Sequence, residues 1–185
     1  ERGVAATVAV NVASKQFSQP SFLDEVREAL DAARVPAESL HIEITEGTTM
    51  DPRAMETCSR LSKLGVRLHL DDFGTGYSSL TYLTRMPVNS LKVDRSFISQ
   101  LLEDPLSAAI TQTVLTLASS LGMDAIAEGV ETEAQADALR RMKCPLGQGY
   151  LWSKPVDAER AFELLTMRHR ASLGPRVATI SSPPP

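Results

Sequence analysis

The chain has 185 residues, of which 43% are hydrophobic and 23% are charged, and its formal net charge is −4. This balance is typical of a folded globular domain, and the acidic charge excludes broad electrostatic capture of a nucleic acid polymer. No apolar run reaches the roughly 18 to 20 residues that a membrane span requires, so we expect no membrane contact by this segment.

Short β-branched runs alternate with longer amphipathic patterns along the chain. The predicted strands are residues 4–11, 40–44, 66–71, 90–93, 123–127 and 148–151. The predicted helices are residues 21–33, 51–64, 78–84, 106–121, 133–142 and 158–168. This alternation favours a parallel sheet with crossover helices, which is either a doubly wound sheet or a (β/α) barrel.

The two ends of the chain and its cysteines carry further expectations. The sequence opens without a methionine, close to an apolar run, which indicates a piece of a longer protein. Residues 170–185 are rich in proline and serine, so we expect a disordered tail after a domain of residues 1–169. Cys58 and Cys144 lack the spacing of a zinc site, which favours reduced thiols and a cytoplasmic location.

The polar residues within the predicted strands favour the barrel. His41 and Glu43 share one face of the second strand, and Arg67, His69 and Asp71 share one face of the third. A polar face on a parallel strand is costly unless it lines a closed interior that holds a ligand. Six predicted strands carry a polar residue near the C-terminal end, where barrel enzymes place their active sites. These residues are Asn11, Glu43, Asp71, Lys92, Glu128 and Gln148.

Two consecutive aspartates, Asp71 and Asp72, end the third predicted strand shortly before Gly74. Two neighbouring carboxylates can present oxygens to two metal ions if the backbone turns at this point. For an isolated pair of aspartates, an acidic turn or helix cap is the more common explanation. The acidic residues of the other strands favour the metal site.

Glu43 and Glu46 are predicted to have different tasks. Glu43 lies on the inward strand face and suits a hard divalent ion, to which Asn11 would add a neutral oxygen. Glu46 falls just past the strand, where its carboxylate could order the glycine-containing loop at 73–79. The alternatives are a solvated surface glutamate at position 46 and a turn-forming asparagine at position 11.

Lys92 lies between Leu91 and Val93, which both need burial. Its amine must therefore reach a carboxylate, a phosphate or solvent, and a lysine that reaches the surface is the alternative. Glu128 ends a predicted strand before Gly129, a position from which a carboxylate can reach an active site.

Five segments in order resemble the signatures of EAL-domain cyclic di-GMP phosphodiesterases. They are residues 43–46 (EITE), 71–76 (DDFGTG), 91–94 (LKVD), 128–131 (EGVE) and 148–151 (QGYL). Together they make a specific signal, although each one alone would be weak.

The resemblance implies a TIM-like (β/α) barrel of the EAL type, with two divalent metal ions, Mg²⁺ or Mn²⁺. The implied metal ligands are Asn11, Glu43, Asp71 and Asp72. The implied catalytic residues are Lys92, Glu128 and Asp72. Gln148 and Pro155 would contact the substrate, and Glu46 would order the loop after the aspartates.

The implied activity is metal-dependent hydrolysis of cyclic di-GMP, a bacterial second messenger, to linear pGpG. A fused GGDEF or sensor domain and a homodimer are further expectations. The Glu-Ala-Leu motif that names the family is absent, so we expect a barrel that is incomplete at its N-terminus and poor hydrolysis by this segment alone. Two alternatives stay open. One is a degenerate EAL module that binds cyclic di-GMP or a partner protein without turnover, and the other is an unrelated metal-dependent barrel phosphohydrolase.

Overall fold

The computed structural model describes residues 6–50, 52–75 and 83–171, and its strands form one parallel sheet in which each strand lies beside the next. The six strands are β1 (Val8–Asn11), β2 (Leu40–Thr45), β3 (Arg67–Phe73), β4 (Ser90–Val93), β5 (Asp124–Ala127) and β6 (Leu146–Gly147). A doubly wound sheet would reverse its strand order, whereas this sequential order is that of a (β/α) barrel. Among the described residues β1 and β6 do not pair, so the sheet is an open, curled half-barrel.

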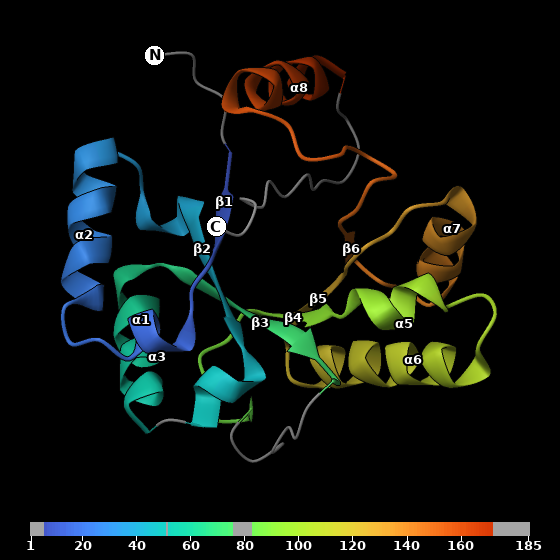
Figure 1. Cartoon of the computed structure of the whole chain (residues 1–185), viewed down its shortest axis with the longest axis horizontal. Helices are drawn as coiled ribbons and strands as arrows, with labels where there is room; N and C mark the ends of the chain where they lie inside the picture. The colour runs from blue at the N-terminus through green and yellow to red at the C-terminus, as the bar shows by residue number, and fades with distance from the viewer. Residues whose placement is uncertain (1–5, 51, 76–82, 172–185) are drawn as a thin grey trace.

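Helices follow the strands and cover the sheet in two groups. The helices are α1 (Ser14–Phe17), α2 (Phe22–Ala33), α3 (Pro52–Leu64), α5 (Arg95–Ser99), α6 (Pro105–Ser120), α7 (Glu133–Arg141) and α8 (Ala158–Ala171), with short 3-10 turns η1 (Ala37–Ser39) and η2 (Glu46–Met50). In Figure 1, α1, α2 and α3 lie beside the first strands, α5, α6 and α7 lie beside the last strands, and α8 lies apart at the top.

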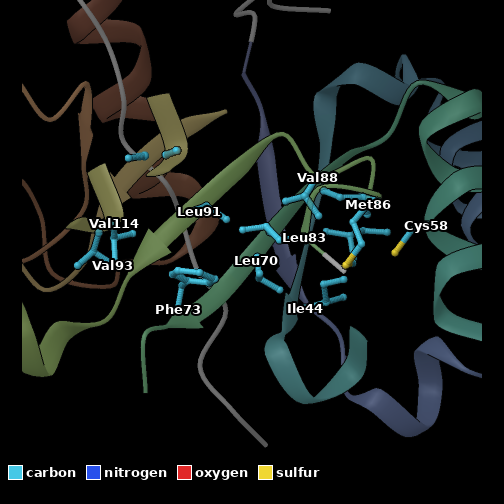
Figure 2. Close-up of a cluster of buried hydrophobic side chains, with 14 of the residues drawn as sticks. Ile44, Cys58, Leu70, Phe73, Leu83, Met86, Val88, Leu91, Val93 and Val114 are labelled. Atoms are coloured by element: carbon cyan, nitrogen blue, oxygen red, sulfur yellow. The ribbon is translucent and has the colours of Figure 1, made fainter. Parts of the chain in front are cut away.

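The hydrophobic core lies between the outer face of the sheet and the helices. Ile44, Leu70 and Leu91 project from three neighbouring strands into this layer, and Figure 2 shows them with Cys58 of α3 and Val114 of α6. All five side chains are buried. Because side chains alternate along a strand, burying this face turns the intervening polar residues towards the barrel interior.

The structure corrects the last predicted strand and adds two short helices. Residues 148–151 form a turn after β6 instead of a strand, because Gly149 lies against the backbone of Val130, where a Cβ would meet the Val130 carbonyl oxygen at 2.1 Å. The sequence patterns missed α1 and α5, which are too short to show an amphipathic repeat. The N-terminal parts of the first predicted strand (residues 4 and 5) and most of the predicted helix 78–84 lie outside the described residues.

The last helix overlaps the first two residues of the predicted tail. Helix α8 continues to Ala171, so Arg170 and Ala171 belong to the helix and not to the predicted tail. The rest of that predicted tail lies outside the described residues.

Candidate active site

The side chain of Lys92 lies at the centre of an acidic cluster inside the half-barrel. Its Nζ is 2.6 Å from Glu43 Oε2, 3.0 Å from Asp71 Oδ1 and 2.5 Å from Glu128 Oε1. Only 2% of Lys92 is exposed. Lys92 therefore does not reach the surface, and one buried cation holds together carboxylates from β2, from β3 and from the residue that follows β5.

The strand register explains how these groups meet. Glu43 of β2 pairs with His69 of β3, and Asp71 lies two residues further along the same face. Glu128 follows β5, where its backbone N–H donates to the Val93 carbonyl oxygen of β4 at 3.1 Å. All of these side chains therefore gather at the C-terminal edge of a parallel sheet.

An irregular end of β3 brings both aspartates to this edge. The register with β4 shifts between Leu70 and Phe73, and Asp72 has a φ of 54°, which is rare for a residue with a side chain. In a regular strand Asp71 and Asp72 would face opposite sides. Here oxygens of Asp71, Asp72 and Glu128 lie within 4.8 Å of one another, a group that could hold a metal ion.

Glu46 reaches the loop that follows the aspartates. Its Oε1 accepts a hydrogen bond from the backbone N–H of Gly74 at 3.0 Å, and Glu46 itself is buried. Gly74 has a φ of 98°, a conformation that favours glycine. Glu46 therefore contacts the start of the loop that it is predicted to order, and residues 76–79 of that predicted loop lie outside the described residues.

The structure places the remaining predicted residues less centrally. Asn11 ends β1, is exposed and pairs in register with Glu43. Gln148 follows β6, and its side-chain Oε1 is buried without a hydrogen-bond partner among the described residues. Pro155 is exposed and lies between β6 and α8.

Burial and neighbouring charges shift the pKa values of Lys92 and Glu128. Burial disfavours the charged ammonium of Lys92, but the carboxylates around it outweigh this effect and raise its pKa above the ordinary value. Burial raises the pKa of Glu128 to about 7, although the charge of Lys92 acts in the opposite direction. Lys92 is therefore charged at neutral pH, and Glu128 can gain or lose a proton there.

The cluster has more negative than positive groups. Burial raises the pKa of Glu43, and burial together with the charge of Asp71 raises the pKa of Asp72. One oxygen of Glu43, Oε1, is buried without a hydrogen-bond partner among the described residues. Hard divalent cations prefer carboxylate oxygens as ligands, and a cluster with net negative charge attracts them. The residues present therefore fit Mg²⁺ or Mn²⁺.

Two histidines lie beneath the cluster, and sequence reasoning assigned them no role. The rings of His41 and His69 are 4.6 Å apart, and His69 Nδ1 is 4.0 Å from Glu43 Oε1. Burial first, and then the neighbouring His41, lowers the pKa of His69 to about 3, so its ring is neutral at neutral pH. The alternation of the strands placed both histidines inside the barrel, but only the structure shows that they touch.

The sequence profile of the EAL domain matches residues 1–155 of this chain. The chain belongs to the EAL domain family. This EAL chain is 42% identical over 155 residues to MucR of Pseudomonas aeruginosa, a protein named as a bifunctional diguanylate cyclase/cyclic di-GMP phosphodiesterase. The match covers 83% of the chain but only 23% of MucR.

Solved EAL structures share the fold. The MucR phosphodiesterase in complex with cyclic di-GMP superimposes with a TM-score of 0.81 at 41% identity, covering 84% of this chain and 64% of that one. A manganese and cyclic di-GMP complex of BlrP1 from Klebsiella pneumoniae has a TM-score of 0.73 at 29% identity, covering 80% of this chain and 38% of that one. These similarities confirm a (β/α) barrel of the EAL type, open in the described residues. None of the helices in the described part of the chain is long and apolar enough to cross a membrane.

Proposed function

We propose that this EAL domain hydrolyses cyclic di-GMP to linear pGpG with the help of divalent metal ions. The observation that carries the proposal is the buried cluster in which Glu43, Asp71 and Glu128 surround Lys92. A degenerate domain would have lost part of this set, whereas here every member is present and in contact. Two EAL structures that superimpose on the chain were solved with cyclic di-GMP, which supports the choice of substrate.

The metal ligands we propose are Asp71, Asp72 and Glu43, with Asn11 at the adjacent strand end. Asp71 and Asp72 present oxygens in one group with Glu128, and Glu43 Oε1 is buried without a hydrogen-bond partner among the described residues. Bound Mg²⁺ or Mn²⁺ would supply an activated water for attack on phosphorus and would neutralise charge on the phosphate.

Lys92 and Glu128 would handle charge and protons during the reaction. The ammonium of Lys92, held in a water-poor site, stabilises the negative charge that grows on the phosphoryl oxygens. Glu128 has a pKa of about 7, so its carboxylate can accept the proton of the attacking water at neutral pH. The water oxygen bonds to phosphorus as the P–O3′ bond breaks, Glu128 returns the proton to the leaving 3′ oxygen, and the ring opens to pGpG.

Glu46, Gln148 and Pro155 would shape the surroundings of the reaction. Glu46 holds the backbone at Gly74, and this contact limits the movement of the loop that follows the two aspartates. The Oε1 of Gln148, which has no hydrogen-bond partner within residues 6–50, 52–75 and 83–171, is an acceptor for a substrate N–H or hydroxyl group. Pro155 is exposed, so its ring is accessible to a substrate.

The proposal is tested by incubating the full-length protein with cyclic di-GMP and Mn²⁺ and separating the nucleotides by chromatography. We expect pGpG to form, to disappear when a chelator removes Mn²⁺, and to be absent with Asp71→Asn. Asp137→Asn is the matched control, because Asp137 is an exposed aspartate of α7 whose ion pair is with Arg140 of the same helix. Binding of cyclic di-GMP without any turnover would favour the degenerate module instead.

A further inference from the structure

Arg95 contacts the segments that follow two neighbouring strands. It begins α5, three residues after Lys92, and its Nη2 is 2.6 Å from Glu131 Oε1 in the segment after β5. The Arg95 guanidinium also lies over the ring of Tyr150, in the turn after β6, at 6.0 Å from the ring centroid. We call these two contacts, together with the packing of the Arg95 stem against Gly129, the Arg95 bridge.

The stem of Arg95 fills the space above Gly129. A Cβ on Gly129 would lie 2.3 Å from Arg95 Cγ and 2.8 Å from Arg95 Cδ, so the two residues are in close contact. Gly129 also has a φ of 68°, which disfavours any other residue there. Gly129 is bonded directly to Glu128, so the stem of Arg95 limits the movement of the backbone that carries the Glu128 carboxylate.

The rest of this segment is held by Gln135 of α7. The Gln135 Oε1 accepts hydrogen bonds from the backbone N–H groups of Glu131 at 2.8 Å and Thr132 at 3.0 Å, and its Nε2 donates to the Ile98 carbonyl oxygen at 3.2 Å. Ile98 belongs to α5, as Arg95 does. The segment after β5 is thus attached to the helix after Lys92 at two points, and the point nearest to Glu128 is Arg95.

Folding does not require the charge pair of this bridge. The side chains of Arg95 and Glu131 are 61% and 43% exposed, and exposed ion pairs contribute little to stability. Small displacements of a catalytic group, in contrast, have large effects on rate and ligand affinity. The bridge is therefore placed where it can affect the site more than it affects the fold.

We propose that Arg95 is a positioning residue that holds Glu128 against Lys92 by restraining the segment from Gly129 to Glu131. The restraint on this segment can be tested without metal. Only the expected effect on metal binding rests on the proposed function. The Lys92–Glu128 distance of 2.5 Å is the geometry that the bridge maintains.

Amide hydrogen exchange of the metal-free protein tests the restraint itself. The Val130 N–H donates to the Gln148 carbonyl oxygen at 3.0 Å and reports on the segment. With Arg95→Ala we expect its exchange to be at least about 10-fold faster, with no change in the midpoint of thermal unfolding. Arg140→Ala is the matched control, because Arg140 is also 61% exposed and pairs only with Glu133 and Asp137 of its own helix in the described structure. Equal exchange at Val130 in the two variants would overturn the proposal.

Mn²⁺ binding tests the consequence for the site. Glu128 belongs to the group of oxygens that could hold a metal ion together with Asp71 and Asp72. We therefore expect Arg95→Ala to weaken Mn²⁺ binding about 10-fold by calorimetry, as is usual for residues that orient groups around a metal. Arg95→Met keeps the stem over Gly129 and should lose less affinity than Arg95→Ala. Faster exchange with unchanged Mn²⁺ affinity would show that Arg95 holds the segment without positioning Glu128, and the proposal would be wrong. If the wild-type protein bound no Mn²⁺, the metal site in the proposed function would be wrong. Hydrogen exchange alone would then decide whether Arg95 restrains the segment.

Discussion

At the scale of single residues, Lys92 and its carboxylates depend on one another. A buried lysine is stable as a cation only with anionic partners, and the buried carboxylates need the lysine when no metal is bound. From the position of Lys92 between two apolar residues, the sequence predicted that its amine reaches a carboxylate, a phosphate or solvent. It could not predict which carboxylates would reach Nζ, because that depends on strand register and on the bulge of β3.

Asp71→Asn and Glu46→Gln test the proposed metal ligand against the proposed loop-ordering residue. Asp71→Asn removes a negative charge from the oxygen group shared with Asp72 and Glu128, so we expect hydrolysis to fall by more than about 100-fold. Glu46→Gln keeps an oxygen that can accept from the Gly74 N–H, so we expect a loss of about 10-fold. Steady-state rates across a Mn²⁺ titration measure both. If excess Mn²⁺ restored Asp71→Asn to the wild-type rate while Glu46→Gln stayed inactive, the two assignments would have to be exchanged.

His69 makes the free energy of unfolding of the metal-free protein depend on pH. Its folded pKa of about 3 lies below the ordinary value of 6.5, so the unfolded chain binds more protons between these values. The stability that neutral His69 contributes is present above pH 6.5 and is lost as the pH falls towards 3. Between pH 6.5 and pH 5 this loss is about 2 kcal/mol.

Urea unfolding in the presence of a chelator measures this effect. We expect His69→Gln to lose less stability than the wild type between pH 6.5 and pH 5, whatever its stability at pH 6.5. Identical slopes for the two proteins would show that His69 accepts a proton in the folded state without cost.

At the scale of elements, the strands that carry polar inward residues could be predicted and the turns between them could not. Periodicity identified β2, β3 and β4 because their apolar faces contact the helices. The turn after β6 was predicted as a strand, because its apolar residues satisfy the same pattern. What prevents a strand there is the close contact between Gly149 and the backbone of Val130, which involves residues far apart in the sequence.

Two glycines with different surroundings test the importance of this contact. An alanine at position 149 would place a Cβ 2.1 Å from the Val130 carbonyl oxygen and 2.3 Å from its nitrogen, so the segment after Glu128 must move. We expect Gly149→Ala to reduce the free energy of unfolding by more than about 3 kcal/mol. Gly122 has a φ of 70°, but nothing lies within 4 Å of the Cβ that an alanine would add there. We therefore expect Gly122→Ala to reduce the free energy of unfolding by about 1 kcal/mol. Equal losses by urea unfolding would mean that the turn after β6 adapts freely.

At the scale of the whole molecule, the sheet and its helices form half of a barrel with the acidic cluster at one edge. The alternation of elements and the polar strand ends predicted this architecture, and the solved EAL structures confirm it. The chain spans only 23% of MucR, so fused domains, a homodimer and the regulation of the whole protein stay proposals.

Metal binding should stabilise the whole domain. At a Mn²⁺ concentration about 100-fold above Kd, binding to the folded state adds about 2.7 kcal/mol. For a domain of this size that raises Tm by roughly 5 to 10 °C. Scanning calorimetry with and without Mn²⁺ measures the shift, which we expect Asp71→Asn to abolish and Asp137→Asn to keep. A shift of the same size in both variants would place the metal elsewhere.

The central claim is that the acidic cluster around Lys92 is a divalent metal site, and anomalous diffraction from crystals grown with Mn²⁺ tests it most directly. The account predicts anomalous peaks among the carboxylate oxygens of Glu43, Asp71 and Asp72, at about 2.0 to 2.4 Å from the ligands. Saturating Mn²⁺ with no peak in this cluster, while Lys92 keeps its contacts to the carboxylates, would contradict it.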